Sequence, residues 1–229
     1  MKRINCFVPF QDAAQVAHTV KGLKESDLVS KIYLLATETV SDAPEGCTVV
    51  PVQSLNSTDA VRKIAALADA DYTMLYTKYT SLELGMFALE RMLHIADDSA
   101  AGMVYADHYI VTNGTAKNNP VISYQQGSLR DDFNFGSVLI YNTSVLKEAV
   151  AQMTADYQFA GLYDLRLKAS QKASLVHINE YLYSEVEQDT RKSGEKIFDY
   201  VDPKNRAVQI EMEEAVRNTL RRSADTWLR

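Results

Sequence analysis

Cysteine is scarce in this sequence. Only two of its 229 residues are cysteines, which is too few for a disulfide framework. Cys6 and Cys47 both lie in apolar runs that are typical of strands. This pattern indicates buried free thiols in a reducing compartment, so we expect a cytoplasmic protein.

Long apolar runs are also missing. The N-terminal run at 4–8 is too short for a signal peptide. No later window approaches the roughly 18 to 20 apolar residues that a membrane-spanning helix needs. The sequence therefore predicts neither export nor a membrane span.

Basic residues are fewer than acidic residues in this sequence. The 24 Lys and Arg residues are outnumbered by 30 Asp and Glu residues, giving a formal net charge of −6. A negative surface repels polyanions, so we expect no binding to nucleic acid.

No glycine-rich loop of the Walker or dinucleotide type occurs, and no serine or cysteine lies in a recognisable nucleophile elbow. Covalent catalysis is therefore not expected.

Hydrophobic residues make up 46% of the sequence, enough for one sizeable core. Their spacing predicts strands at 4–8, 30–36, 47–52, 72–77 and 102–106, alternating with helices at 12–23, 60–70 and 82–96. Such alternation predicts an α/β domain whose mostly parallel sheet is flanked by helices. Ligands of such folds bind beyond the carboxyl ends of the strands.

The pattern changes in the second half of the chain. Segments 109–112 and 121–124 flank an Asn- and Gly-rich turn, which predicts a hairpin. Beyond it we expect a strand at 136–141, helices at 143–153 and 162–172, a strand at 174–178 and a charged terminal helix at 211–228.

Three polar segments are candidates for chemistry. Asp107 follows the strand predicted at 102–106, the loop at 128–137 contains Arg130, Asp131 and Asp132, and Asp164 lies in the first turn of a helix. Carboxylates bind divalent metals or accept protons from hydroxyls, and a guanidinium matches phosphate oxygens. These are the groups that sugar transfer from a nucleotide requires.

Each candidate also has a structural explanation. Asp107 has the chemistry to cap a turn, the loop charges to form a solvated ion pair, and Asp164 to interact with the helix dipole. His108 is more typical of a surface or hairpin position than of a ligand. His18 and His94 lie inside amphipathic helices, where structural roles are the rule.

The order of these features resembles the inverting family 2 glycosyltransferases of the GT-A fold, over nearly the whole chain. The segment Phe7-Val8-Pro9-Phe10-Gln11-Asp12 looks like the family's first strand and its nucleotide-base loop. Arg62 lies in a helix similar to the family's Ala-Arg-Asn helix, and Tyr105-Ala106-Asp107 is similar to its Tyr-Ser-Asp strand. Tyr163-Asp164 resembles the Glu-Asp pair that supplies the catalytic base.

The resemblance implies a GT-A-like mixed, mostly parallel sheet flanked by helices. It also implies a role for each matched residue. Asp164 would take the proton of the acceptor hydroxyl, and Asp107 would be the carboxylate left to bind Mn or Mg. The residues implied to bind substrate or nucleotide are Pro9, Phe10, Gln11, Glu38, Arg62, Lys78, Asp107, Arg130, Asp131 and Asp132.

Two departures from the family pattern concern the binding of the nucleotide-diphosphate donor. The Asp-x-Asp metal motif is replaced by Thr77-Lys78-Tyr79. The Asp-Asp-Gly-Ser/Thr loop is replaced by residues 36–41, where Glu38 is the one carboxylate. We hypothesise that the ammonium of Lys78 partly replaces the divalent cation beside a diphosphate.

The predicted function is transfer of a sugar from a nucleotide-diphosphate donor to a hydroxyl of a carbohydrate or glycolipid, as in polysaccharide biosynthesis. The alternative is a catalytically inactive GT-A-like domain that binds a nucleotide or glycan within a larger protein. A sugar nucleotidyltransferase fits less well, because no Gly-rich Arg/Lys loop follows the first strand.

The predicted domain organisation has two parts. Residues 1–200 form the glycosyltransferase-like domain. Residues 201–229 form a helical extension that packs on it or on sequence further downstream. A homodimer and an additional C-terminal domain are both compatible with this organisation.

Overall fold

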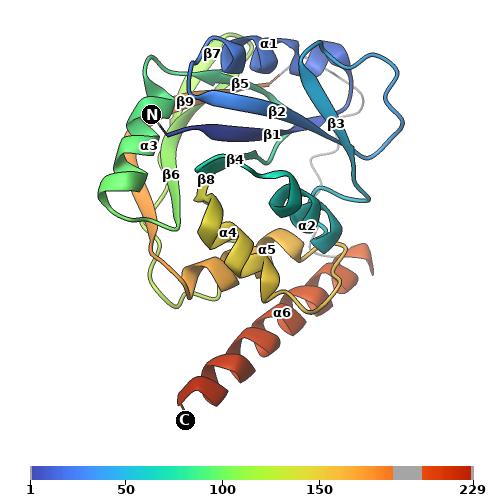
Figure 1. Cartoon of the computed structure of the whole chain (residues 1–229), viewed down its shortest axis with the longest axis vertical. Coiled ribbons are helices and arrows are strands. Elements are labelled where there is room, and N and C mark those ends of the chain that lie inside the picture. The colour runs from blue at the N-terminus through green and yellow to red at the C-terminus, as the bar shows by residue number, and fades with distance from the viewer. Residues whose placement is uncertain (1, 188–202, 228–229) are drawn as a thin grey trace.

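The computed structural model describes residues 2–187 and 203–227, with side chains described for 2–187 and 206–221 (Figure 1). Its centre is a nine-stranded sheet in the order β3-β2-β1-β4-β8-β6-β9-β5, with β7 paired to β6. The strands are β1 (Ile4–Phe10), β2 (Val29–Ala36), β3 (Cys47–Pro51), β4 (Tyr72–Tyr76), β5 (Ser81–Leu84), β6 (Met103–Thr112), β7 (Thr115–Asn119), β8 (Val138–Asn142) and β9 (Leu175–Val186).

Most strands of this sheet run in one direction. Strands β3, β2, β1 and β4 pair in parallel, and β6 pairs in parallel with β9. Strand β8 lies antiparallel between β4 and β6, so these two point the same way. Strands β5 and β7 are antiparallel to their neighbours. The sheet is thus mixed but mostly parallel, as the sequence predicts.

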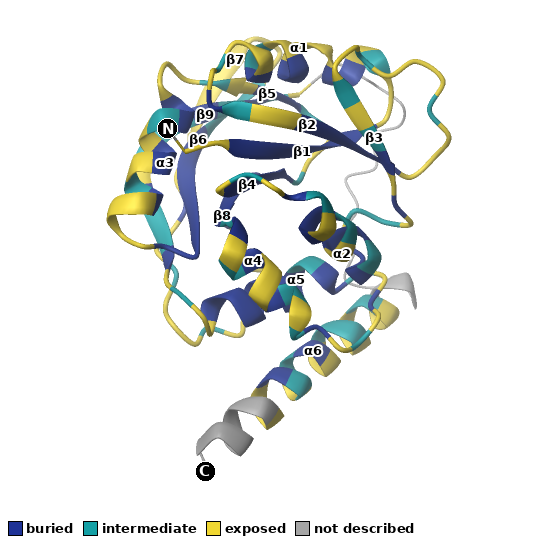
Figure 2. Cartoon of the chain, viewed as in Figure 1, coloured by how far each residue is buried: buried dark blue, intermediate teal, exposed yellow. Residues whose placement is uncertain are grey.

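Helices cover both faces of the sheet (Figure 1). One face packs against α1 (Ala13–Lys24) and α3 (Ala88–Asp98), and the other against α2 (Thr58–Leu67), α4 (Thr143–Ala151) and α5 (Gly161–Ser170). Successive residues of a strand point to opposite faces, so Cys6 and Val8 join the first core cluster and Phe7 joins the second. Every residue of β1 is buried (Figure 2), which explains its unbroken apolar run.

Side-chain caps fix where the first two helices begin. Asp12 accepts a hydrogen bond from the backbone N–H of Gln15 at the start of α1. Ser57 accepts one from Ala60 at the start of α2. Each cap satisfies a helical N–H that has no partner within the helix. Helices in these two places, at 12–23 and 60–70, were predicted from the spacing of apolar residues.

The helix predicted at 82–96 is wrong over its first turns. Residues Ser81–Leu84 form β5, in which Leu82 pairs with Glu185 of β9. The backbone N–H of Gly85 donates to Leu182, and α3 begins only at Ala88. Tertiary pairing with β9 therefore overrides the helical spacing of the apolar residues.

The hairpin is present, but its second strand lies earlier than predicted. Asn113 and Gly114 both have positive φ, 50° and 74°, and together they turn β6 directly into β7. Such a two-residue turn suits the twist of the paired strands. Residues 121–124 therefore follow the hairpin instead of forming it.

Helix α6 (Pro203–Trp227) packs against α5 and extends beyond the rest of the fold (Figure 1). Ala215 of α6 packs with Tyr157 and Tyr163 in a small apolar cluster. The predicted boundary between residues 200 and 201 lies outside the described residues, as does Leu228. The division into two domains stays a prediction.

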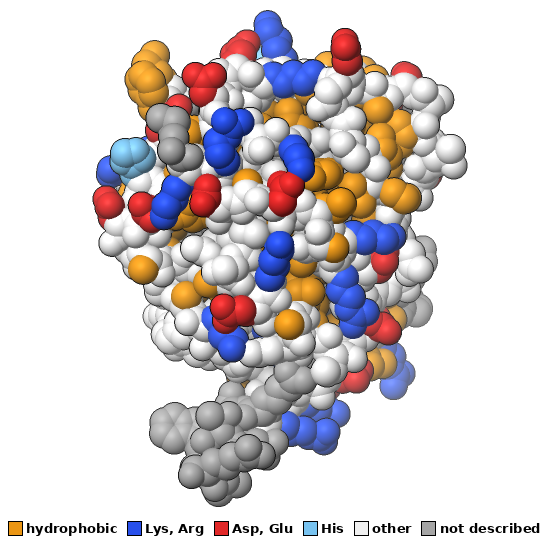
Figure 3. All heavy atoms as spheres, in the orientation of Figure 1, with side chains coloured by type: hydrophobic (Ala, Val, Ile, Leu, Met, Phe, Trp, Pro, Cys, Tyr) orange, Lys and Arg blue, Asp and Glu red, His pale blue; other side chains and the backbone are white. Residues whose placement is uncertain are grey.

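The remaining expectations concern thiols and membrane spans. Cys6 and Cys47 are both free, the first buried and the second half-buried. No helix within the described parts of the chain is long and apolar enough to cross a membrane. On the face shown in Figure 3, basic and acidic side chains are interspersed.

Gly161 provides a test of how closely α5 packs on α2. A Cβ at this position would lie 2.4 Å from the backbone carbon of Ser57 and 2.4 Å from the nitrogen of Thr58. We expect Gly161→Ala to lower the free energy of unfolding by about 1–3 kcal/mol, the usual cost of overpacking. Urea denaturation measures this change.

Gly22 is the matched control. It also lies in a helix, and a Cβ there would meet nothing within 4 Å. Gly22→Ala should raise the stability by about 0.5–1 kcal/mol, because alanine favours a helix more than glycine does. Equal effects of the two substitutions would contradict the close packing at Gly161.

Candidate functional site

The order of the strands singles out one crevice. The chain runs from β1 outward to β2 and β3, and then returns to the other side of β1 to form β4. The connections therefore reverse direction between β1 and β4. In open α/β sheets, ligands bind outside the carboxyl ends of the strands at such a switch point.

A cavity of about 540 Å³ lies at this position, and we call it the switch-point pocket. It lies between the loops that follow β1 and β4, and Glu187, directly after β9, also lines it. Its lining residues are Gln11, Asp12, Gln15, Thr77, Lys78, Tyr79, Thr80 and Glu187. The sequence predicted two of these, Gln11 and Lys78, as ligand-binding residues.

Gln15 links the two loops of the switch-point pocket. Its side-chain oxygen accepts from the backbone N–H of Gln11 at 3.2 Å, and its nitrogen donates to the carbonyl of Tyr79 at 2.9 Å. Gln15 lies in α1, so the helix fixes the distance between the loops. The pocket is thereby organised before any ligand binds.

Lys78 is held by a buried carboxylate. Its ammonium lies 2.6 Å from Oε2 of Glu185, whose side chain is only 3% exposed, while that of Lys78 is 49% exposed. Oε1 of Glu185 lies 3.1 Å from Nε2 of His108, which is buried and stacks on Tyr183 at 4.8 Å between ring centroids. Strand β9 thus supplies a fixed counter-charge beneath Lys78.

The pKa of Glu185 reflects two opposing effects. Burial by itself would raise this pKa, because it disfavours the charged form. Interactions with His108, Lys78 and Ser137 together outweigh burial and lower the pKa from its ordinary value of 4.5 to about 2. The carboxylate is therefore ionised at neutral pH and holds Lys78 by charge as well as by hydrogen bonding.

The other candidates at this edge of the sheet differ in accessibility. Pro9 and Phe10 end β1 and are buried, so they form part of the wall and core beneath the loop. Glu38 is exposed in the loop that follows β2. Their roles in binding a nucleotide stay predictions.

Asp107 lies within β6 and is 1% exposed. Its Oδ1 accepts from the backbone N–H of Val121 at 2.9 Å and lies 2.7 Å from Nε2 of His177. Because its neighbour Tyr105 points into the second core cluster, Asp107 belongs to that face of the sheet and does not line the switch-point pocket.

The charged loop also lies outside the switch-point pocket. Arg130 and Asp132 form an ion pair at 2.9 Å, and both side chains are 67% exposed. Asp131 lines a separate cavity of about 360 Å³ between Tyr163 and α6. Arg130 and Asp132 thus form the solvated local ion pair that was the structural explanation of the loop charges. A role of this loop in binding a nucleotide-sugar stays a prediction.

Arg62 joins helix α2 to the loop after α4. Its guanidinium forms an ion pair with Asp156 and donates to the carbonyl of Met153 at 3.2 Å. Arg62 is absent from the lining of the switch-point pocket. The observed contacts give it a role in packing, and a role in binding remains a prediction.

Asp164 lies in α5, in a polar cluster beneath α6. Its side chain is 4% exposed and lies 2.8 Å from the ammonium of Lys168, which is 2% exposed. The same ammonium donates to the hydroxyl of Thr219 in α6 at 2.7 Å. Acting as a base would require Asp164 to lose this cover, so its catalytic role stays a prediction.

The structure therefore does not gather all the predicted residues at one site. Gln11 and Lys78 meet at the switch-point pocket, and Phe10 lies at the adjoining strand end. Asp107, Arg130 and Asp164 lie in three other environments, each with its own partners.

Some functional candidates were missed at the sequence level. Gln15, Glu185 and Glu187 contribute to the switch-point pocket or support it. The signal for Glu185 was a charged residue inside the aromatic strand segment at 181–186. Its partner Lys78 is 107 residues away in sequence, so only the fold reveals the pair.

The side chains in the described part of the chain include no group of three or more His, Cys, Asp or Glu residues suited to a metal ion. Asp107 is engaged with Val121 and His177, and the ammonium of Lys78 is paired with Glu185. These residues do not by themselves form a set of ligands for Mn or Mg. Bound substrate oxygens would have to complete any metal site.

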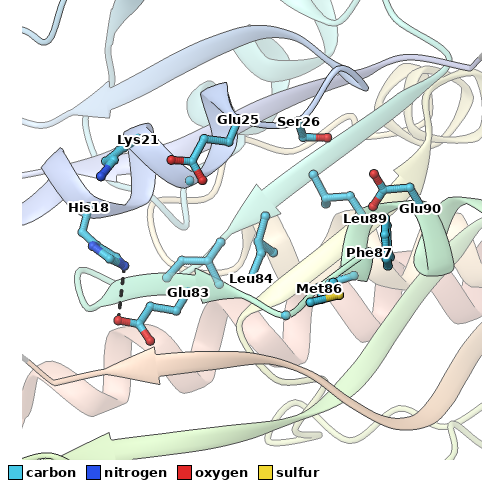
Figure 4. Close-up of a pocket in the computed structure, with 14 residues that line it drawn as sticks. His18, Lys21, Glu25, Ser26, Glu83, Leu84, Met86, Phe87, Leu89 and Glu90 are labelled. Atoms are coloured by element: carbon cyan, nitrogen blue, oxygen red, sulfur yellow. Dashed lines mark ion pairs between the residues drawn. The ribbon is translucent and has the colours of Figure 1, made fainter.

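A larger cavity, of about 620 Å³, lies between α1 and the β5-α3 segment (Figure 4). Its lining includes Glu25, Glu83 and Glu90 but only one lysine, Lys21, and His18 lies 3.2 Å from Glu83. Carboxylates outnumber lysines here, as they do in the switch-point pocket, so charge does not distinguish the two cavities. The switch-point pocket is the better candidate for a nucleotide because it lies where the strand order reverses.

No protein-family model matches the chain, and no curated protein sequence matches it either. Solved structures do. A crystal structure of residues 1–349 of TarS from S. aureus in complex with UDP-GlcNAc has a TM-score of 0.55 and 12% identity, covering 82% of this chain and 59% of that one. Structures of the same protein without a named ligand and with UDP give TM-scores of 0.56 and 0.54 at 10% and 11% identity.

These neighbours have the GT-A glycosyltransferase fold, and the chain shares that fold. The structure without a named ligand and the UDP complex are covered over 60% and 61% of their length, and this chain over 80% and 81% of its own. The chain thus spans about three fifths of the structures it matches. At this level of identity the likeness concerns the fold alone.

Glu185 makes a prediction about acid stability. Because its pKa is lowered in the folded state, its contribution is present above pH 4.5 and is lost as the pH falls toward about 2. We expect the free energy of unfolding of the wild type to fall more steeply across this window than that of Glu185→Gln. Urea denaturation at a series of pH values measures both slopes, and identical slopes would contradict the assignment.

Asp164 makes a prediction about buried charge. Asp164→Asn leaves the buried ammonium of Lys168 without its counter-ion, which should destabilise the fold by about 3–5 kcal/mol. The control is Asp59→Asn, because Asp59 pairs with Lys63 at the same spacing and the same 2.8 Å distance, but at the surface. That loss should cost about 1 kcal/mol or less. Similar costs in thermal denaturation would show that burial does not decide the effect.

Proposed function

We propose that this chain binds a nucleotide-diphospho-sugar in the switch-point pocket and transfers the sugar to a hydroxyl of a carbohydrate or glycolipid acceptor. The single observation that carries the proposal is the pocket itself, at the carboxyl ends of β1 and β4, with the half-exposed ammonium of Lys78 in its wall. The GT-A fold supports the proposal, since its neighbours were crystallised with UDP-GlcNAc and UDP. The free thiols are compatible with the cytoplasmic location that we also propose.

The charges around the pocket indicate that a diphosphate needs additional positive charge in order to bind. Lys78 provides one positive charge, but Asp12 and Glu187 are also among the lining residues and Glu185 lies beneath. A diphosphate would therefore meet more negative than positive charge. We propose that a divalent cation enters with the diphosphate and is coordinated mainly by phosphate oxygens, with Lys78 as a supplementary charge.

A second candidate function is supported by the environment of Asp164. In the observed arrangement this carboxylate is paired with Lys168 and covered by α6. An enzyme of this type requires a base that reaches the acceptor hydroxyl. A catalytically inactive domain that binds a nucleotide or glycan within a larger protein therefore remains the alternative proposal.

Binding of UDP-GlcNAc, measured by isothermal titration calorimetry with and without manganese, tests the proposed site. Lys78→Gln should weaken binding about tenfold, the effect of losing one charged hydrogen bond. Lys78→Arg retains the charge and should recover much of the affinity. Lys63→Gln removes an exposed lysine of α2 outside the pocket and should leave the affinity unchanged.

The results separate the proposals. An unchanged affinity in Lys78→Gln, or no binding of any uridine, guanosine or cytidine diphosphate sugar, would refute the pocket assignment. Binding followed by release of the nucleoside diphosphate in the presence of an acceptor supports transfer. Binding without such turnover, across a panel of glycan acceptors, supports the inactive binding domain.

A further inference from the structure

A second group of reactive side chains lies on the other face of the sheet, outside the switch-point pocket. The hydroxyl of Ser123 lies 3.2 Å from Nδ1 of His177. The other ring nitrogen, Nε2, lies 2.7 Å from the carboxylate of Asp107. A serine, a histidine and an aspartate are therefore connected in one hydrogen-bonded line.

Burial increases along this line from the serine to the aspartate. Ser123 is exposed, the side chain of His177 is 8% exposed and that of Asp107 is 2% exposed. When the buried carboxylate accepts a hydrogen bond from Nε2–H of the imidazole, the lone pair of Nδ1 is directed at the serine hydroxyl. This is the arrangement in which a histidine acts as a base toward a hydroxyl and an aspartate stabilises the resulting imidazolium.

Tyr105 holds both the base and the loop that carries the serine. Its ring stacks on His177 with 5.3 Å between centroids and 17° between planes. Its hydroxyl donates to the carbonyl of Ile122 at 2.8 Å and accepts from the backbone N–H of Tyr124 at 2.7 Å. These two bonds flank Ser123 on either side, so the hydroxyl is positioned before any reaction.

Asp107 anchors the start of the same loop. Its Oδ1 accepts from the backbone N–H of Val121 in addition to facing His177. The aspartate therefore fixes the imidazole and the loop in one geometry. A nucleophile held in this way loses little conformational freedom when it reacts.

We propose that Ser123 is a nucleophile activated by His177 and Asp107, and that it forms an ester with activated acyl or phosphonyl groups. In this step the Ser123 oxygen attacks the carbonyl carbon or the phosphorus, and a new bond to oxygen forms. The bond to the leaving group breaks, and the leaving group departs with its electron pair. The hydroxyl proton moves to Nδ1 of His177 and from there to solvent.

The probe for this proposal is a biotinylated fluorophosphonate, in which fluoride is the leaving group. We expect one adduct per chain by intact-mass spectrometry, mapped to Ser123 by peptide analysis, and none in Ser123→Ala. Ser144 is the control, since it is an exposed serine that donates to Asn142 instead of a histidine. Ser144→Ala should react as the wild type does.

His177→Gln tests the base separately from the fold. The glutamine amide can still donate to Asp107, but it offers no basic nitrogen to Ser123. We expect labelling to slow by about 100-fold or more, the usual contribution of a general base. Tyr105→Phe keeps the ring stack and removes both loop bonds, so we expect labelling to slow while the thermal midpoint shows that the protein remains folded.

Three results would overturn the proposal: no adduct on the folded wild type, an adduct at another residue, or an unchanged rate in His177→Gln. None of these depends on nucleotide binding, because Ser123 and His177 do not line the switch-point pocket. Failure of the sugar-transfer proposal and failure of this one are therefore distinguishable.

Discussion

The pairing of β1 with both β2 and β4 is the constraint on which the rest of the structure depends. All residues of β1 are buried, and the strand receives parallel partners on either side. Because the connection reverses at β1, the loops after β1 and β4 must separate and leave a crevice. The switch-point pocket is a direct consequence of that connection.

Buried charge pairs decide what each part of the fold can do. Glu185 fixes Lys78 at the switch-point pocket, where the ammonium remains half-exposed and available to a ligand. Lys168 fixes Asp164 under α6, where neither group reaches solvent. Both are ion pairs between a lysine and a carboxylate. The Lys78 ammonium is accessible to a ligand because its side chain is half-exposed, whereas Asp164 is inaccessible because both members of its pair are buried. Removing one partner from a buried pair is costly, so both arrangements resist change.

Much of the fold could be predicted because its signals are local. The run 4–8 predicts a buried strand, and Asp12 and Ser57 predict helix starts, since each depends on neighbouring residues alone. The prediction failed at 82–84, where a helical pattern pairs with β9 instead. At the candidate site, Gln11 and Lys78 were predicted, whereas Glu185 was not, because its importance arises from a residue 107 positions away.

The sequence by itself determined an α/β domain with few cysteines, a negative net charge and a buried central strand, since composition and spacing carry this information directly. Only the tertiary structure decided which polar residues meet. It placed Lys78 on Glu185, Asp164 on Lys168, and Asp107 in line with His177 and Ser123. The physical reason is that a side chain's chemistry depends on its burial and its partners, and strand pairing brings those partners from distant parts of the chain.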